Sequence, residues 1–335
     1  MKTIKLIYLL FILFVSNENF SQYGTLDTTF DTDGKVITFF GNYYATFQSL
    51  AFQQDGKIIA AGTVDNHGGF YQFGIARYNS DGSLDSTFGI DGKVIGDFLG
   101  YQIGLKKMVL QSNGKILVSG IIYTGYTNTA SILARYNSNG SLDDTFGNNG
   151  FIVRDFFQIF AMVLQTDGKI IETGSFSDAL GTSSVICRYY ENGTLDATFG
   201  NNGAITTSVE FEYSATNNIS LLSNGKIIVS GYIPNNSVAD GKDYAVIRLR
   251  NNGVLDTTFG NNGMVIIDVD DLDYMVSLKI QTDGKIVFTG SSAHVETQYT
   301  WSTSKKNDSP FVKWKSRQHV RNKWNCYHAN KSKFN

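Results

Sequence analysis

The sequence predicts an all-β protein built from repeated units of four short antiparallel strands. Three observations support this prediction. Short patterns recur at a spacing near 58 residues, Gly-containing turn signals separate apolar runs, and no segment shows the 3.6-residue period of an amphipathic helix. The composition agrees, because the 335 residues include 34 Gly and only 2 Pro, and 42% are hydrophobic. These proportions favour a core-forming chain with many turns.

The N-terminal segment differs from the rest. Lys2 and Lys5 precede an apolar run from Leu6 to Val15, and Ser21 offers a small residue for cleavage. The run is too short to cross a bilayer as a helix, which requires about 20 residues. We therefore predict that residues 1–21 are a secretory signal peptide. The mature chain is expected to be secreted or held at the cell surface, with no transmembrane helix.

Three patterns recur in the same phase through residues 22–300. They are LDxTF, an Asp or Asn followed by GK, and an Arg that ends an apolar run. LDxTF begins at Leu26, Leu84, Leu142, Leu195 and Leu255, and the glycines of the second pattern are Gly56, Gly114, Gly168, Gly225 and Gly284. Patterns that keep one phase indicate structural repeats, and this period accommodates four strands with their turns.

The second unit shows how each repeat is expected to fold. We expect its strands, in this order, in GKVIGDF, IGLKKMVLQ, KILVSGIIY and SILARYN. Asn-Gly favours a tight hairpin between the second and third, and SNGSLDDTFG then turns the chain into the next unit. Such units are typical of propeller blades, so we predict a β-propeller-like array of four complete blades and a partial fifth. A β-solenoid is the alternative, although it favours shorter and more uniform units.

The repeated motifs also resemble a known family. NSDGSLDSTFG, LQTDGKI and IARYN are similar to the delta-60 repeat, a propeller-like module of exported bacterial proteins. The resemblance covers roughly residues 22–300. It implies an extracellular protein with several blades and an undefined ligand, and it brings no catalytic residues to this chain.

The last 35 residues contrast with the repeats. Residues 301–335 hold nine Lys and Arg and one Asp, whereas residues 22–300 hold 17 Lys and Arg and 28 Asp and Glu, a net charge of −11. Codons compatible with Lys313 to Asn325, read one base forward, encode NGSLDNTFGTNG, which is the repeat pattern near its expected position. We therefore expect the tail to be an out-of-frame reading of a blade, and to be disordered.

The tail has a second possible interpretation. Lys and Arg interleaved with Trp314 and Trp324 ordinarily indicate nucleic-acid binding. Because the out-of-frame reading explains the same residues, we expect no nucleic-acid partner. For the same reason, we do not interpret His319, Cys326 and His328 as a metal site.

Acidic loops inside the repeats raise the question of calcium. Oxygen-bearing side chains surround Gly in Asn79–Asp85, and carboxylates gather in Asp31–Gly34 and Asp268–Asp273. Asn and Asp before Gly are also what turns require, and an EF-hand beginning at Asn79 would need an acid where Ile90 stands. We interpret these segments as turns, expect no cofactor, and keep calcium as the minor alternative.

Each complete unit carries an Arg and an Asp eight residues apart. The pairs are Arg77 and Asp85, Arg135 and Asp143, Arg188 and Asp196, and Arg248 and Asp256. A charge pair copied into each blade is expected to order the geometry between blades rather than to catalyse, because an active site is needed once. Cys187 takes the position held by Ala76 and Ala134 in other units, so we expect a small core residue there.

No catalytic triad, zinc-binding pattern, phosphate loop or dinucleotide fingerprint is recognisable in the sequence. We therefore predict an exported binding module or scaffold that is not an enzyme, with an unidentified protein or glycan ligand. Unrepeated insertions that include Phe70 and Tyr71 are the expected binding region. Two alternatives stay open. One is a propeller enzyme acting on a glycan or another extracellular polymer, recognisable by converging carboxylates in different environments. The other is a truncated product without function.

Overall fold

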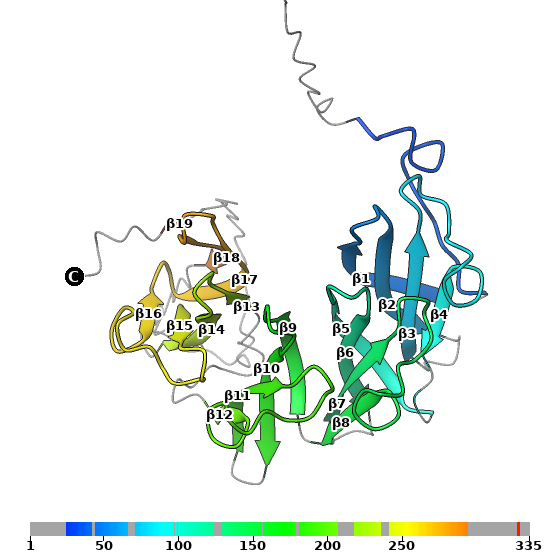
Figure 1. Ribbon diagram of the computed structural model, residues 1–335. Helices are drawn as coiled ribbons and strands as arrows, with labels where there is room; N and C mark the ends of the chain where they lie inside the picture. Colours follow the sequence, from blue (N-terminus) through cyan, green and yellow to red (C-terminus); the bar gives the residue numbers. More distant parts are fainter. Residues whose placement is uncertain are drawn as a thin grey trace, which may run out of the picture.

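The computed structural model describes residues 25–41, 44–65, 71–96, 98, 100–123, 129–155, 157–178, 181–206, 218–235, 241–293 and 327–328. All regular secondary structure in these residues is β-strand, which confirms the predicted all-β class (Figure 1). None of them forms a helix with the length and apolar character needed to span a membrane. The predicted signal peptide, and all of the basic tail except Tyr327–His328, lie outside the described residues.

Three antiparallel sheets of four strands form the first three blades. Blade 1 contains β1 (Tyr44–Phe52), β2 (Ile58–Asp65), β3 (Tyr71–Tyr78) and β4 (Lys93–Gly96); blade 2 contains β5 (Gln102–Leu110), β6 (Ile116–Tyr123), β7 (Thr129–Tyr136) and β8 (Phe151–Asp155); and blade 3 contains β9 (Phe157–Leu164), β10 (Ile170–Asp178), β11 (Gly181–Tyr189) and β12 (Ala204–Thr206). Strands that follow one another in sequence are paired within each blade.

The fourth blade and a partial fifth complete the described array. Blade 4 contains β13 (Asn218–Leu221), β14 (Ile227–Asn235), β15 (Gly241–Leu249) and β16 (Met264–Ile267), and the fifth blade begins with β17 (Leu272–Ile280) and β18 (Ile286–Ala293). One parallel pair, Lys242 opposite Leu272, joins the two, and β18 also pairs with the two-residue β19 (Tyr327–His328). Four blades plus a partial fifth are therefore present, as predicted. The blades follow one another around an open arc (Figure 1).

The predicted order of strands within a unit is wrong. GKVIGDF, expected as a first strand, contains β4, which pairs with β3 as the fourth strand of blade 1. The loop Asn79–Gly92 folds back on the strand that it leaves: the Arg77 amide donates to the Gly92 carbonyl, and the Asp85 amide donates to the Arg77 carbonyl. The LDxTF loop therefore lies inside a blade, and the chain crosses to the next blade after the fourth strand.

Glycine is required at two kinds of position. The hairpin between the first and second strands has its Gly at positive φ, as at Gly56 with φ 84°, which confirms the predicted tight turn. In the middle of the second strand, Gly120 faces a bulge in β5, where a Cβ would lie 2.4 Å from the Gly104 carbonyl oxygen. Both positions recur in other blades because each blade repeats the same hairpin.

The hydrophobic core lies between the blades. One face of blade 1, including Ile59 and Ile75, packs against Met108 and Ile116 of blade 2. Leu117, the next residue along β6, points to the opposite face and joins a second cluster shared with blade 3. Since successive side chains on a strand point to opposite faces, an internal blade presents two apolar faces and needs a neighbour on each.

Candidate functional site

All four predicted Arg–Asp pairs are brought together in the structure. The Arg Nε atom donates to the Asp Oδ2 atom in each pair: the distances are 2.7 Å for Arg77 and Asp85, 2.6 Å for Arg135 and Asp143, 2.8 Å for Arg188 and Asp196, and 2.7 Å for Arg248 and Asp256. The Asp of each pair is buried. The pairs lie at the end of the blades that carries the hairpin between the first two strands.

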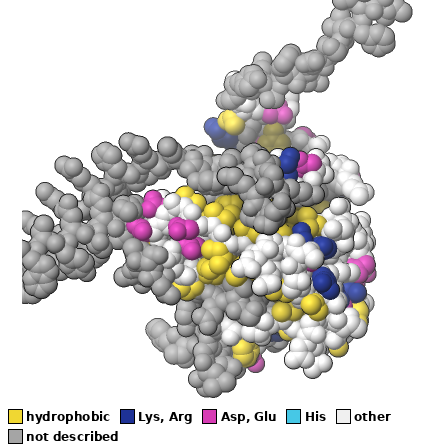
Figure 2. All heavy atoms as spheres, turned by 90° about the vertical axis from the view of Figure 1, so that its left-hand side faces the viewer, with side chains coloured by type: hydrophobic (Ala, Val, Ile, Leu, Met, Phe, Trp, Pro, Cys, Tyr) yellow, Lys and Arg dark blue, Asp and Glu magenta, His cyan; other side chains and the backbone are white. Residues whose placement is uncertain are grey.

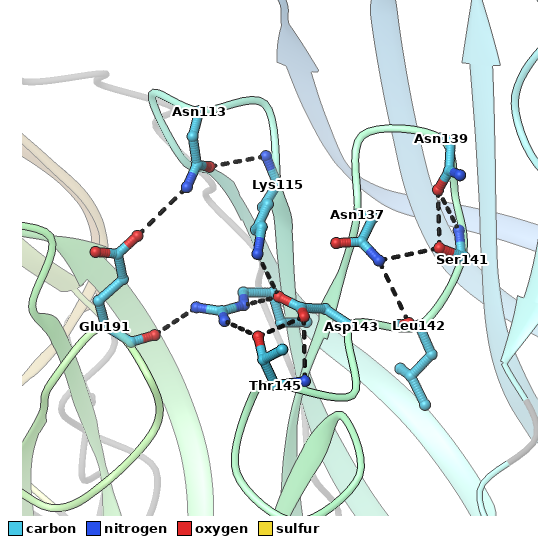
Figure 3. A network of polar contacts seen from close by, with 10 residues as sticks. Asn113, Lys115, Asn137, Asn139, Ser141, Leu142, Asp143, Thr145 and Glu191 are labelled. Atoms are coloured by element: carbon cyan, nitrogen blue, oxygen red, sulfur yellow. Dashed lines mark hydrogen bonds and ion pairs between the residues drawn. The ribbon is translucent and has the colours of Figure 1, made fainter.

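Each pair belongs to a larger cluster, which we call the Arg–Asp network and describe for blade 2 (Figure 3). Thr145 donates to the second carboxylate oxygen of Asp143 through its hydroxyl at 2.7 Å and its amide at 3.2 Å, and Lys115 Nζ lies 2.7 Å from Asp143 Oδ2. The guanidinium of Arg135 lies 4.7 Å from the centre of the Phe146 ring. The carboxylate is therefore surrounded by donors and two cations.

The Lys of this network is a residue that the sequence interpretation missed. It is the Lys of the recurring DGK or NGK pattern. The Nζ atoms of Lys57, Lys115, Lys169 and Lys226 lie 2.8, 2.7, 3.5 and 2.7 Å from Asp85, Asp143, Asp196 and Asp256. The signal was present, since this pattern keeps the same phase as the Arg and the Asp. A Lys placed directly after the hairpin reaches the loop because the two turns lie at the same end of the antiparallel sheet.

The network also crosses from one blade to the next. The Nη1 atom of Arg77 donates to the Ser138 carbonyl in blade 2, and the same atom of Arg135 donates to the Glu191 carbonyl in blade 3 (Figure 3). Arg188 makes the same bond to Asn251 in blade 4. Backbone bonds run beside these contacts, for example from the Gly147 amide to the Asn192 carbonyl at 2.9 Å. Each Arg that makes this bond links its own Asp to the following blade.

The environment of the carboxylates shifts their ionisation. Burial alone raises the pKa of Asp143, but hydrogen bonds from Lys115 and Thr145 and the bond and charge of Arg135 together hold it well below its usual value. For Asp256, the hydrogen bond from Lys226 is the main cause of a lowered pKa. The network Asp residues are therefore ionised at neutral pH.

The opposite end of the blades has a different character. It carries the starts of the first strands and the connections between second and third strands. Exposed aromatic side chains stand there in four blades: Tyr71 on β3, Tyr101 before β5, Tyr123 on β6, Phe176 on β10 and Tyr274 on β17. We call this surface the aromatic end. The expected insertion residue Tyr71 is part of it, whereas Phe70 lies outside the described residues.

At the aromatic end, two tyrosine rings and a lysine lie together between blades 4 and 5. The Tyr232 and Tyr274 rings meet edge to face with centres 5.3 Å apart. Lys242 Nζ lies 5.4 Å from the first ring centre and 5.8 Å from the second. Aromatic rings that are partly exposed beside a cation can bind ligands by stacking and by hydrogen bonding.

Three carboxylates converge near the same end. Single ligand atoms of Asp243, Asp268 and Asp273 all lie within 4.8 Å of one another, a group that the segment Asp268–Asp273 partly anticipated. Asp273 is buried and Asp268 is exposed. Burial raises the pKa of Asp273, although Ser292 and the Val269 amide donate to its carboxylate. These oxygens are of the kind that calcium prefers.

Two further features considered in the sequence are the segment Asn79–Asp85 and Cys187, which lie in a turn and in the core. Asp81 Oδ1 accepts from the Ser83 amide at 2.9 Å and from its hydroxyl at 2.6 Å, with Gly82 at φ 88°, so this segment forms a turn. Cys187 is buried in the core between blades 2 and 3, as expected, and burial raises the pKa of its thiol.

One charge pair, with a buried Glu, has no counterpart at the preceding junction. Arg154 on β8 donates to Glu172 on β10 and to the hydroxyl of Tyr189, and it lies 4.1 Å from the centre of the Phe157 ring. By register, Arg154 and Glu172 correspond to Gly96 and Val118 at the preceding junction. Both members of the pair therefore occur together at the one junction between blades 2 and 3. The sequence interpretation missed them because they follow no period.

The sheets, the core between blades and the repeated network define a β-propeller-like repeat protein. Comparison with known families agrees. Residues 53–88, 111–146, 165–199 and 222–259 match the family described as "Domain of unknown function (DUF5122) beta-propeller". Each matched segment contains one Arg–Asp pair and ends at the Phe of LDxTF. The match identifies these four segments as β-propeller repeats.

Several solved structures are similar to the chain. One is MPT-4, a mannose phosphorylase from Leishmania mexicana, with 12% identity over 75% of this chain and 81% of that chain and a TM-score of 0.38. Another is a GH43 endo-arabinanase from Bacillus licheniformis, with 14% identity over 73% and 87% and a TM-score of 0.36. A putative glycoside hydrolase from Bacteroides ovatus has 12% identity over 75% and 82% and a TM-score of 0.34. No curated protein matches the chain.

Proposed function

We propose that the protein is an exported, non-catalytic binding module in which a rigid array of blades presents a ligand-binding surface at the aromatic end. One observation carries this proposal. The repeated charged side chains at one end bond to each other and to the next blade, whereas unrepeated aromatic side chains at the other end are exposed. The first group holds the array together, and the second is free to meet a ligand.

A glycan is the ligand class that this surface favours. The flat rings of Tyr101 and Tyr123 can stack on the apolar faces of sugar rings, and their hydroxyl groups can bond to sugar hydroxyls. Both side chains are exposed and both belong to the aromatic end of blade 2. A protein ligand is the other outcome that a binding experiment would reveal.

The test is a binding screen of the purified chain against a panel of extracellular polysaccharides, followed by calorimetry. We expect Tyr101→Ala combined with Tyr123→Ala to weaken binding by about tenfold or more, because each ring supplies contact area at the surface. Ile90→Ala is the matched control, since Ile90 is exposed and follows the LDxTF motif. It lies at the end of the blades that carries the Arg–Asp network, which we call the network end. Equal losses in the two variants would contradict the proposed location.

Export is the second part of the proposal. It is supported by the short apolar run after Lys2 and Lys5, and by the resemblance of the repeats to the delta-60 module of exported bacterial proteins. The test is expression in a bacterial host with N-terminal sequencing of the secreted product. A mature chain that begins near Gln22 is the expected result, and retention of the intact precursor in the cytoplasm would contradict it.

A second candidate function rests on the acidic cluster. Asp243, Asp268 and Asp273 converge in different environments, an arrangement that can provide both an acid and a base for glycan hydrolysis. Release of new reducing ends from a bound polysaccharide, lost in Asp268→Asn and retained in Ile90→Ala, would favour this candidate over the binding module.

A further inference from the structure

One apolar face of blade 1 is exposed although the same face is buried elsewhere. On β1, Phe47, Leu50 and Phe52 are 42%, 59% and 70% exposed. We call these three residues the β1 face. Exposed aromatic and aliphatic side chains that gather on one strand are uncommon away from interaction sites.

The register identifies the equivalent residues in the other blades. Phe47 lies opposite Gly62, as Leu105 lies opposite Gly120 and Met275 opposite Gly290. Leu50 corresponds in the same way to Met108 of blade 2 and to Leu278 of the fifth blade. The equivalents are almost completely buried: Leu105 and Met108 are each 4% exposed, and Met275 and Leu278 are 2% and 3% exposed.

A preceding blade covers these equivalents. Leu105 and Met108 pack in one cluster with Ile59 and Ala61 of blade 1. The β1 face has only part of such a cover. Val36 and Phe40, which take the places of Val94 and Phe98 in the repeat, pack beside Ala60 and Ala76. The β1 face therefore lacks the part of the cover that the first and second strands of a preceding blade supply elsewhere.

The other end of the array offers the complementary surface. Val287 and Thr289 of β18 correspond to Ile59 and Ala61 by their place after the DGK hairpin, and both are partly exposed. We call these two residues the β18 face. Every described second strand has a small residue at the place of Thr289: Ala61, Ser119, Thr173 and Ser230. Figure 2 views the molecule from the side at the left of Figure 1, where hydrophobic side chains gather in several groups on the surface that the described residues form.

We propose that the β1 face of one copy of the chain binds the β18 face of a second copy, so that the chains associate head to tail. This contact continues the interface that already joins each blade to the next. Within one chain, β1 and β18 stand at the two ends of the open arc (Figure 1). The two surfaces are unlike, so the contact is heterologous and leaves one of each surface free on every dimer. The inference concerns assembly and is independent of the proposed ligand.

Sedimentation of the purified chain at increasing concentration tests the proposal. The expected result is a mass that rises with concentration. Leu50→Asp should raise the dissociation constant by about a hundredfold or more, because the contact would bury a carboxylate without a partner. Ile90→Asp is the control, since it adds the same charge at an exposed side chain outside the β1 face and should leave assembly unchanged.

Mixing two variants gives the decisive measurement. Leu50→Asp blocks the β1 face and leaves the β18 face intact, whereas Thr289→Arg does the opposite. Neither variant should associate alone, and the mixture should form a complex of one copy of each. A wild-type chain that stays monomeric at all concentrations, as closure of the arc within one chain would produce, overturns the proposal. Failure of the two folded variants to combine overturns it equally.

Discussion

The two ends of each blade are made by the same strands but use their polar and aromatic side chains differently. At the network end, Arg135, Asp143 and Lys115 bond to one another, and Arg135 also reaches the next blade. At the aromatic end, Tyr101 and Tyr123 are exposed. The network is copied in four blades, whereas the aromatic positions differ from blade to blade. The copied arginines bond across three successive junctions, and residues that are not copied can fit one ligand.

Acid is expected to have the largest effect on the stability of the array, because it protonates the Asp of all four networks together. The pKa values of Asp85, Asp143, Asp196 and Asp256 are lowered in the folded chain. Their stabilisation is therefore fully present above the unfolded pKa of about 3.9 and is lost as the pH falls through the folded values. Urea unfolding monitored by circular dichroism should show a falling midpoint below about pH 4. A midpoint that is the same at pH 2.5 and pH 7 would contradict the role assigned to the network.

Removing one arginine breaks one junction. Arg135→Ala removes the bonds of Arg135 to Asp143 and Thr145 and its bond to the Glu191 carbonyl of the next blade. Because these bonds belong to one charged group and are lost together, we expect a loss of about 3–5 kcal/mol in the free energy of unfolding. Urea unfolding at pH 7 measures the loss. The control is Tyr123→Ala at the other end of the same blade, for which we expect a change of about 0.5 kcal/mol or less. Similar losses for both variants would remove the distinction between the two ends.

The unrepeated pair Arg154 and Glu172 tests whether a charge pair that occurs at one junction is needed for stability as the repeated networks are. Arg154→Gly alone should destabilise by about 3–5 kcal/mol, because Glu172 would be left buried and unpaired. Adding Glu172→Val gives this junction the residue types found at the preceding one, where Gly96 and Val118 stand. The double variant should have a stability within about 1–2 kcal/mol of wild type or above it. A double variant as unstable as the single one would show that this junction depends on the charge pair itself.

The smallest effect is expected for the lysine of the network. Lys115 is partly exposed, and Asp143 keeps Arg135 and Thr145 when the lysine is removed. Lys115→Ala should therefore reduce the unfolding free energy by only about 1 kcal/mol or less. Repeating the measurement at high salt separates the charge from the packing of the side chain, since salt should shrink the difference between variant and wild type.

The repeats made part of the site predictable. Arg77 and Asp85 recur at one spacing in every unit, so one local geometry had to serve them all, and their contact could be expected without coordinates. The lysine of the DGK pattern kept the same phase and was still missed, because its contact depends on which turns share an end of the sheet. The order of strands was wrong for a related reason: the loop that bends GKVIGDF back onto its own blade is not visible as a period.

The sequence alone determined the strands, the hairpins, the number of units and the copied charge pairs, because these depend on neighbours a few residues apart and repeat with the chain. Tertiary structure decided which surfaces are free. Phe47 and Leu50 occupy the same repeat positions as Leu105 and Met108, yet the first two are exposed and the others are buried. The side chains are equally apolar, and only the presence of a neighbouring blade distinguishes them. Burial is a property of what lies across the interface, and no local pattern records it.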